Sequence, residues 1–256
     1  MTTENETSTC KKVWSYWEGS KPTLVEDCLE TWEKHLGSSG WEINVLTPET
    51  VHQFNIIKPK SYDSLLPAHR ADVIRLSLLY SYGGLWLDAS TYLTENVDWL
   101  IYKPVSLCGV QYWKNDKPAS YIENWILYTK PKNKVVLLWL KTLNEILDTS
   151  PVTNHRAYDS PCVESCDYFM AYQAFCMLRE QHQEFEEIYQ AGTKITNDIF
   201  RYSKFKPLSK EKLLVKFTTD GRRTYPFDRF PLIYIYSGVV LVVVISAILI
   251  IRISRK

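Results

Sequence analysis

The chain has 256 residues, of which 45% are hydrophobic and 14% are aromatic, with nine Trp, seventeen Tyr and nine Gly. This composition is sufficient for a substantial buried core, so it excludes an intrinsically disordered, low-complexity or fibrous protein. All 29 acidic residues lie before residue 230, and residues 1–229 carry 27 basic groups, for a net charge of −2. That near balance argues against a nucleic-acid-binding protein, which would carry a basic face.

The first third of the chain alternates predicted strands and helices. Residues 12–16 are short, β-branched and aromatic, which predicts a strand, and residues 22–36 have the apolar spacing of a helix that ends at Gly37. Residues 41–46 alternate apolar and polar side chains, which predicts a second strand. Residues 47–49 (TPE) predict the start of another helix, with proline at its first position. Strand, helix, strand, helix is the opening of a parallel α/β sheet.

The middle of the chain continues this pattern less clearly. Residues 68–82 predict a mostly apolar helix that two glycines close, followed by a strand at 85–89. Further predictions are a strand at 105–110, a polar loop at 114–120, two helices within 121–148 broken at Lys130-Pro131, and a helix at 167–190. Residues 193–228 are mixed, basic and punctuated by proline, and give no clear assignment.

A transmembrane helix is predicted at residues 230–251, which contain no charged side chain. As a helix this segment would be roughly 33 Å long, enough to cross a hydrocarbon core of about 30 Å. Tyr234 and Tyr236 lie near one end and the basic tail at 252–256 follows the other, as is typical of residues at membrane interfaces. The pattern therefore predicts a single-pass membrane protein with a C-terminal anchor.

The predicted organisation is a disordered tail at 1–11, a main domain at 12–217, a basic linker at 218–229 and the anchor. The N-terminus has no apolar segment of the kind found in signal peptides, so we expect the main domain to be cytosolic. Basic residues flank the anchor on both sides, so the positive-inside rule adds little. In a reducing compartment the six cysteines are expected to be free thiols.

Residues 71–90 contain the side chains most suggestive of chemistry. Asp72 and Arg75 are three residues apart, so on a helix they share a face. Arg75 is the single charged residue from Val73 to Tyr82, and a helix this apolar is covered on most sides. Its charged groups must therefore pair or face a polar cavity. The alternative from spacing alone is a purely structural ion pair, with Asp88 capping a turn.

Asp88 and Ser90 follow directly after the glycine turn and the next strand. Because they are two residues apart, they project from the same side of that strand. Two oxygen ligands that point the same way from a strand end suit a hard divalent cation bound to a diphosphate.

The segment AHRADVIRLSLLYSYGGLWLDAS (residues 68–90) resembles the signature of glycosyltransferases with the DXD sugar-binding motif, in the capsular polysaccharide synthesis family. The resemblance extends to VWSYWEG (13–19), to SYIENWILYTKPKN (120–133) and more faintly to KEKLLVKF (210–217). It therefore covers most of residues 12–217.

This resemblance implies a GT-A-like fold, in which a Rossmann-type, mostly parallel sheet has flanking helices. It also implies a nucleotide-diphosphate sugar donor and transfer with retention of anomeric configuration. Carried over to this sequence, Asp72 and Arg75 would hold hydroxyls of the donor sugar, and Asp88 would contact the ribose or the metal–diphosphate unit. These three are the predicted catalytic residues. Trp17 would face the nucleotide base, although an ordinary core tryptophan is an alternative.

Three further predictions concern the donor and the leaving group. Ser90 stands where the commoner motif has a second acid, so Asp88 and Ser90 are the predicted ligands of Mn²⁺ or Mg²⁺, with metal dependence left open. Lys212 and Lys216 are candidates for stabilising the leaving diphosphate, and solvated lysines are the alternative. Asn124 is predicted to contact the sugar or the acceptor, or else to be a helix N-cap.

The leading prediction is a membrane-anchored glycosyltransferase that moves a sugar to a glycan, lipid or protein acceptor. Two alternatives remain: a catalytically degenerate module that binds nucleotide sugars or glycans, because Ser90 replaces an acid, and a membrane-tethered interaction protein. The sequence has no GxGxxG, P-loop, HExxH or GxSxG motif. Its five histidines are scattered, and His69, close to Asp72, is the one expected near the same pocket.

Overall fold

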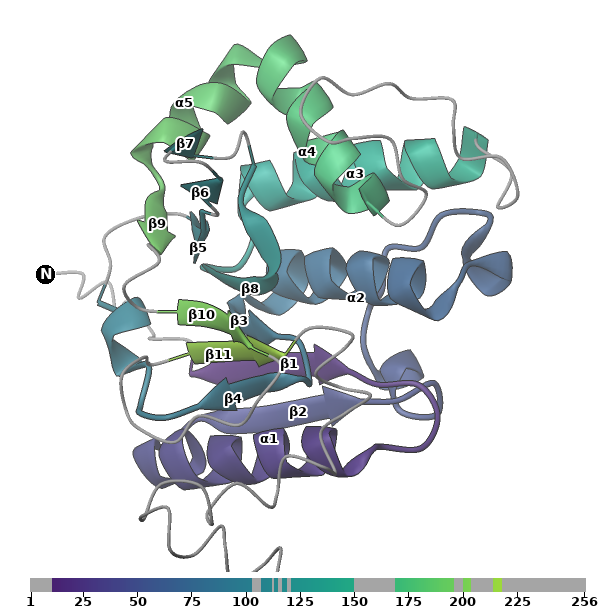
Figure 1. Cartoon of the computed structure of the whole chain (residues 1–256). Coiled ribbons are helices and arrows are strands. Elements are labelled where there is room, and N and C mark those ends of the chain that lie inside the picture. Colours follow the sequence, from purple (N-terminus) through teal and green to yellow (C-terminus); the bar gives the residue numbers. More distant parts are fainter. Residues whose placement is uncertain are drawn as a thin grey trace, which may run out of the picture.

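A six-stranded mixed sheet forms the centre of the protein (Figure 1). The computed structural model describes residues 11–102, 107–111, 113–114, 117–118, 121–149, 169–195, 200–203 and 214–217. The strands of the sheet are, in spatial order, β2 (Glu42–Leu46), β1 (Lys12–Tyr16), β3 (Gly84–Leu87), β8 (Glu123–Thr129), β5 (Leu107–Val110) and β9 (Thr193–Ile195).

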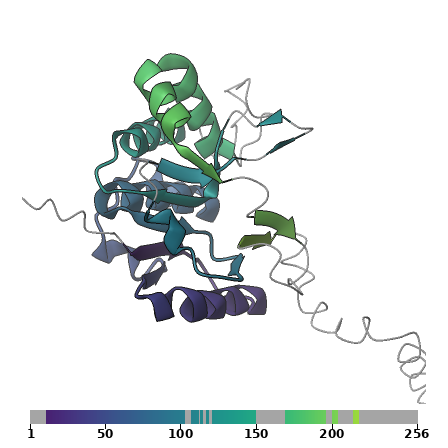
Figure 2. The same ribbon diagram turned by 90° about the vertical axis from the view of Figure 1, so that its left-hand side faces the viewer.

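Helices cover both faces of this sheet. Helix α1 (Thr23–His35) lies on one side of it, and α2 (Pro67–Tyr82), α3 (Lys134–Thr149) and α4 (Met170–Gln181) lie on the other, followed by α5 (Gln183–Ala191). In Figure 2 the sheet lies between the purple helix α1 on one side and the green helices α4 and α5 on the other. Short 3-10 turns are η1 (Gly37–Ser39), η2 (Val51–Gln53), η3 (Tyr62–Ser64) and η4 (Asp98–Leu100).

Two small sheets complete the described strands. One consists of β10 (Phe200–Ser203), β11 (Leu214–Phe217) and β4 (Thr91–Leu93), and the other is the hairpin of β6 (Trp113–Lys114) and β7 (Lys117–Pro118). Strand β11 is antiparallel to β4, with Lys216 opposite Thr91. This pairing brings a strand from the end of the described chain beside the segment that follows β3.

The core follows from the alternation of side chains along the central strands. In β1 and β3, Trp14 and Trp86 face the cluster formed with α2, α3 and α4. Their neighbours Val13 and Leu85 face the cluster around Trp32 of α1. Because successive strand residues point to opposite faces, a run that is apolar at every position is buried on both sides.

The prediction of an α/β fold with flanking helices agrees with this architecture. The sheet is parallel across β2–β1–β3 and between β5 and β9. It departs from a parallel arrangement at β8, which is antiparallel to both β3 and β5.

Three of the helix predictions are wrong in part. The segment from residue 121 to the Lys130-Pro131 break is mainly the strand β8 rather than a helix, and α3 alone follows the break. Residues 47–49 lead into the single turn η2, after which the chain becomes extended at Phe54 so that its apolar side chains pack on the core. The helix predicted at 167–190 is two helices, interrupted at His182, which has an extended backbone.

The predicted anchor at 230–251, the linker, the basic tail and residues 1–10 lie outside the described residues. No helix within the described part of the chain is long and apolar enough to cross a membrane. Cys28 and Cys108 are buried thiols outside any disulfide, as expected, whereas Cys176 is disulfide-bonded, so the expectation is wrong for that residue.

The turn between α2 and β3 depends on two glycines with positive φ, Gly83 at 66° and Gly84 at 97°. A Cβ on Gly84 would lie 2.5 Å from the Lys12 carbonyl oxygen of β1. The Gly84 backbone is therefore held against the neighbouring strand, at the point where the chain turns toward Asp88.

We expect Gly84→Ala to lower the free energy of unfolding by about 3 kcal/mol or more, because strained φ and a backbone overlap add together. Gly40→Ala is the matched control, since Gly40 also has positive φ (78°) but a Cβ there would meet no atom within 4 Å. Its expected cost is about 1 kcal/mol. Urea unfolding measures both, and equal losses would contradict the close approach at Gly84.

Candidate functional site

A cavity of about 670 Å³ lies where β1 and β3 end and β8 begins. Because β1 and β3 are parallel, their carboxyl ends meet at one edge of the sheet, which is the usual place for a ligand in such folds. The cavity is lined by Tyr16, Trp17, Glu18, Pro67, Ala68, Ala71, Asp72, Arg75, Trp86, Asp88, Ala89, Ser90, Tyr121, Glu123, Asn124, Trp125, Phe169, Tyr172 and Lys216.

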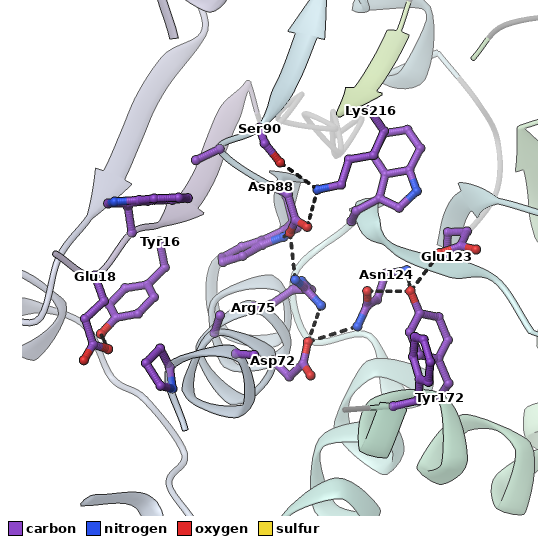
Figure 3. A pocket seen from close by; sticks show the side chains of 18 of the residues that line it. Tyr16, Glu18, Asp72, Arg75, Asp88, Ser90, Glu123, Asn124, Tyr172 and Lys216 are labelled. Atoms are coloured by element: carbon purple, nitrogen blue, oxygen red, sulfur yellow. Dashed lines mark hydrogen bonds and ion pairs between the residues drawn. The ribbon is translucent and has the colours of Figure 1, made fainter. Parts of the chain in front are cut away.

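Arg75 connects two carboxylates on the wall of this cavity (Figure 3). Its guanidinium donates one hydrogen bond to Asp72, one turn earlier on α2, and another of 2.8 Å to Asp88 Oδ1. Trp86 Nε1 donates to the same Asp88 oxygen at 2.9 Å. Arg75 and Asp72 are buried, whereas the side chain of Asp88 is 29% exposed. Buried charges of this kind need partners, and Arg75 and Asp72 supply them to each other.

Lys216 contacts the other side of Asp88. Its ammonium lies 2.6 Å from Asp88 Oδ2 and 3.1 Å from Ser90 Oγ. Lys216 reaches them because β11 pairs with β4, which begins at Thr91, the residue after Ser90. The lysine is buried, and its ammonium also lies 6.0 Å from the centre of the Trp125 ring.

Asn124 extends this network toward the α4 side of the cavity. Its side-chain amide donates a 3.0 Å hydrogen bond to Asp72 Oδ1, the oxygen that Arg75 also contacts. The Tyr172 hydroxyl lies 2.9 Å from Asn124 Oδ1 and 2.8 Å from Glu123 Oε2. Since Asn124 belongs to a strand, it is not the N-cap of a helix, and that alternative is wrong.

The opposite end of the cavity is aromatic and carries one further ion pair. Trp17, which follows β1, is half-buried and its indole nitrogen donates to the Ser20 carbonyl oxygen at 3.1 Å. Glu18 pairs with Arg70 at 2.6 Å and accepts a hydrogen bond from the Tyr16 hydroxyl. Burial raises the pKa of Tyr16, and Glu18 adds to this effect, so the phenol stays protonated and polar.

The two aspartates respond oppositely to burial. Burial raises the pKa of Asp72 to about 6; Arg75 acts to lower that pKa, and the charge of Asp88 adds to the increase. Burial would also raise the pKa of Asp88, but Lys216 and Arg75 outweigh it and hold that pKa well below its usual range. Asp88 is therefore ionised at any physiological pH, whereas Asp72 titrates near neutrality.

The raised pKa of Asp72 has a consequence for stability. The Asp72 carboxyl binds a proton more tightly in the folded protein than in the unfolded chain. Protonation of Asp72 therefore adds to the free energy of unfolding, fully below pH about 4, and this added stability is lost as pH rises through about 6. Arg75, Asn124 and Asp88 are the groups that face it. We expect Asp72→Asn to gain stability relative to the unaltered protein between pH 4 and 7, by on the order of 2 kcal/mol.

Urea unfolding of the two proteins at several pH values measures this difference. Asp63→Asn, at an exposed position on η3, is the control and is expected to show no such trend. A stability difference that does not change with pH would contradict the raised pKa of Asp72.

The described residues do not fit a divalent cation at the predicted ligands. Both Asp88 oxygens and the Ser90 hydroxyl already have partners, and the partner closest to both residues is the Lys216 ammonium. Within the described ranges, no group of three or more histidine, cysteine, aspartate or glutamate side chains could hold a metal ion. A cation in contact with Asp88 and Ser90 would meet the positive charge of Lys216.

All six predicted donor-site residues line this one cavity, namely Trp17, Asp72, Arg75, Asp88, Ser90 and Asn124. Of the two candidate lysines, Lys216 lines it and Lys212 lies outside the described residues. His69 is buried in α2 but is not among the described lining residues. The sequence reasoning missed Tyr16, Glu18, Glu123 and Tyr172; the first three adjoin residues it selected, so their proximity along the chain was the available signal.

Comparison with known proteins agrees with the resemblance noted from residues 68–90. The family described as "Capsular polysaccharide synthesis protein" matches residues 1–213. The chain belongs to this family. The match includes every predicted donor-site residue and confirms the predicted family relationship.

Curated relatives of this capsular polysaccharide synthesis family member are glycosyltransferases. O-glycosyltransferase braB of Annulohypoxylon truncatum is 23% identical over 58% of this chain and 40% of the relative. O-glycosyltransferase PaGT of Phomopsis amygdali is 26% identical over 47% of this chain and 35% of the relative. The matches therefore extend over less than half of each relative. They support the prediction of an enzyme that transfers sugars.

Among solved structures, a glycosyltransferase involved in the glycosylation of the major capsid of PBCV-1 aligns with 80% of this chain and 92% of that chain. The two are 13% identical, with a TM-score of 0.46.

Proposed function

We propose that this protein is a glycosyltransferase with a GT-A-like catalytic domain, which transfers a sugar from a nucleoside-diphosphate donor. The observation that carries the proposal is the row of alternating charges, Asp72–Arg75–Asp88–Lys216, along one cavity wall, in which Asp88 is partly exposed. Parts of this chain are similar to proteins named O-glycosyltransferases, and the row lies at the edge of the sheet where such folds bind ligands.

The lining of the cavity offers a group for each part of a nucleotide sugar. Trp17 and Tyr16 offer aromatic surface for a base near the end of β1. Asp72 and Asn124, at the other end of the row, offer acceptors and donors for sugar hydroxyls. Arg75 and Lys216, which both contact Asp88, supply the positive charge that a diphosphate needs.

The main catalytic task is to stabilise the negative charge that builds up on the leaving nucleoside diphosphate. Fixed cations do this without reorganisation, because Arg75 and Lys216 are already oriented by Asp88. We propose retention of anomeric configuration, with the departing phosphate accepting the proton of the acceptor hydroxyl. Asp88 stays ionised between two cations, which makes it a poor general base.

We further propose that residues 230–251 anchor the enzyme in a membrane, with the catalytic domain on the cytosolic side. An anchored enzyme is concentrated near lipid-linked glycans and membrane proteins, which makes these the favoured acceptors. In all of these acceptors, the group that receives the sugar is a hydroxyl of a glycan, a lipid or a protein.

Hydrolysis and transfer assays with a panel of UDP- and GDP-sugars test the proposed activity. We expect at least one donor to release its nucleoside diphosphate and raise the thermal midpoint of the protein. If a sugar donor binds but is not turned over with any of the acceptors tested, the result would instead favour a catalytically inactive binding module. Absence of both binding and turnover would refute the donor site itself.

The stereochemical part of the proposal has its own test. NMR of the first-formed product reports whether the anomeric configuration is retained. Glu123, held by Tyr172 in the cavity wall, is the carboxylate that an inverting enzyme would use as a base. Retention with full activity of Glu123→Gln would support the proposal, and inversion with loss of activity would refute it.

A further inference from the structure

We infer that the Lys216 ammonium takes the place of the divalent cation at the diphosphate, so that this enzyme transfers sugar without a metal. The inference rests on the proposed function, because it assigns the cation that binds the donor's phosphates at the same site. It differs from the metal site that the motif at Asp88 and Ser90 predicts.

The first step of the argument is position. Asp88 and Ser90 are the two oxygen-bearing residues at the strand end, and a metal in a DXD-type site would contact both. In this protein an ammonium contacts both, at 2.6 Å from Asp88 Oδ2 and 3.1 Å from Ser90 Oγ. The cation that bridges the two motif residues is therefore a side chain of the same chain (Figure 3).

The second step is the shortage of ligands. A divalent cation of this kind takes six or more oxygen ligands, of which carboxylates are the strongest. Asp88 Oδ1 accepts hydrogen bonds from Arg75 and Trp86, and Asp72 Oδ1 accepts from Arg75 and Asn124. Ser90 supplies a neutral hydroxyl where the commoner motif has an acid. One carboxylate that already faces two cations is a weak site for a third.

The third step is how the lysine is held. Its strand pairs with β4, so the position of Lys216 opposite Thr91 is set by main-chain hydrogen bonds of the small sheet. The side chain is 10% exposed and packs near the Trp125 ring. This burial fixes the ammonium in the cavity wall. The family match ends at residue 213, so it does not include Lys216.

The chemistry balances with this ammonium as the cation. The bond between the anomeric carbon and the phosphate oxygen breaks, and its electron pair stays on the nucleoside diphosphate. The acceptor oxygen forms the new bond to the anomeric carbon, and its proton passes to the departing phosphate. Lys216 remains protonated throughout and stabilises the developing charge by hydrogen bonding to a phosphate oxygen.

The test uses the full chain, its Lys216→Met variant, which keeps the apolar stem, and Lys141→Ala as a control at an exposed position on α3. We expect turnover of the unaltered protein and of the control to change less than two-fold when EDTA replaces Mn²⁺. We expect Lys216→Met to lose about 100-fold in kcat in EDTA. Added Mn²⁺ should restore part of that loss, because Asp88 and Ser90 are then available to a metal.

Binding of UDP and GDP, measured by calorimetry in EDTA, gives a second readout that needs no turnover. We expect the unaltered protein to bind one of them and Lys216→Met to bind it at least ten-fold more weakly, with circular dichroism confirming that the variant is folded. EDTA-sensitive turnover or binding in the unaltered protein, or a Lys216→Met variant that is unaffected in EDTA, would overturn the inference. If no sugar donor turns over but diphosphate binding follows this pattern, the proposed function fails while the assignment of Lys216 stands.

Discussion

Asp88→Asn is expected to lower kcat/KM for sugar transfer by about 100- to 1,000-fold. The asparagine side chain has the same size, but it cannot compensate the charges of Arg75 and Lys216, which both contact Asp88. Without that carboxylate the two cations lose their fixed orientation toward the cavity. Initial rates with the best donor, together with circular dichroism to confirm folding, measure the effect.

Asp63→Asn is the matched control for this experiment, because Asp63 is an exposed aspartate that is not among the lining residues of the cavity. It should retain activity within about two-fold, since surface substitutions away from a site have small effects. Turnover of Asp88→Asn equal to that of the control would refute the assignment of the site.

Arg75→Met is expected to lower the free energy of unfolding by about 3–5 kcal/mol, the largest stability effect in this protein's polar network. Arg75 contacts both Asp72 and Asp88, and its side chain is 5% exposed. Its removal leaves two carboxylates beside each other with one cation fewer. Urea unfolding at pH 7 measures the loss.

Two further variants separate charge from packing. Arg75→Met combined with Asp72→Asn should recover more stability than Asp72→Asn gains alone, because one of the uncompensated carboxylates is gone. Arg70→Met removes a more exposed ion pair, with Glu18, and should cost about 1 kcal/mol or less. A loss at Arg75 no greater than that at Arg70, with no recovery in the double variant, would show that burial of the charges contributes little.

The local pattern of the first third of the chain was sufficient to predict β1, α1, β2 and α2. Helix α1 has clean helical spacing and β2 alternates apolar and polar side chains, whereas β1 is short, β-branched and aromatic and α2 is a mostly apolar run. Glycines mark the ends of both helices. Local pattern also placed the residues of the motif. A charged pair on an otherwise apolar helix must form an ion pair or face a polar cavity, and Gly83-Gly84 indicates a tight turn.

Strand β8 could not be recognised in the same way. Trp125, Ile126, Leu127 and Tyr128 are all buried, because the strand lies inside the sheet and is covered on both faces. A continuous apolar run has no period, so periodicity alone does not distinguish a buried strand from a buried helix. Its seven residues and the proline after Lys130 were the signals that favoured a strand.

The role of Lys216 was also beyond the reach of local pattern. It lies 128 residues from Asp88 along the chain and reaches it through the pairing of β11 with β4. No spacing rule connects residues so far apart, and from the sequence alone a solvated lysine was the favoured interpretation of a lysine in this basic segment.

The register of β11 on β4 has a consequence for how the enzyme matures. The main sheet, α2 and the motif carboxylates all precede residue 200, whereas the ammonium that balances Asp88 arrives with β11. A nascent chain that had emerged only that far would hold an acid with too little counter-charge, and a slip of β11 by one residue would turn Lys216 to the opposite face. Under the proposed function, the sheet of β10, β11 and β4 must therefore form before the cavity holds the second cation that contacts Asp88.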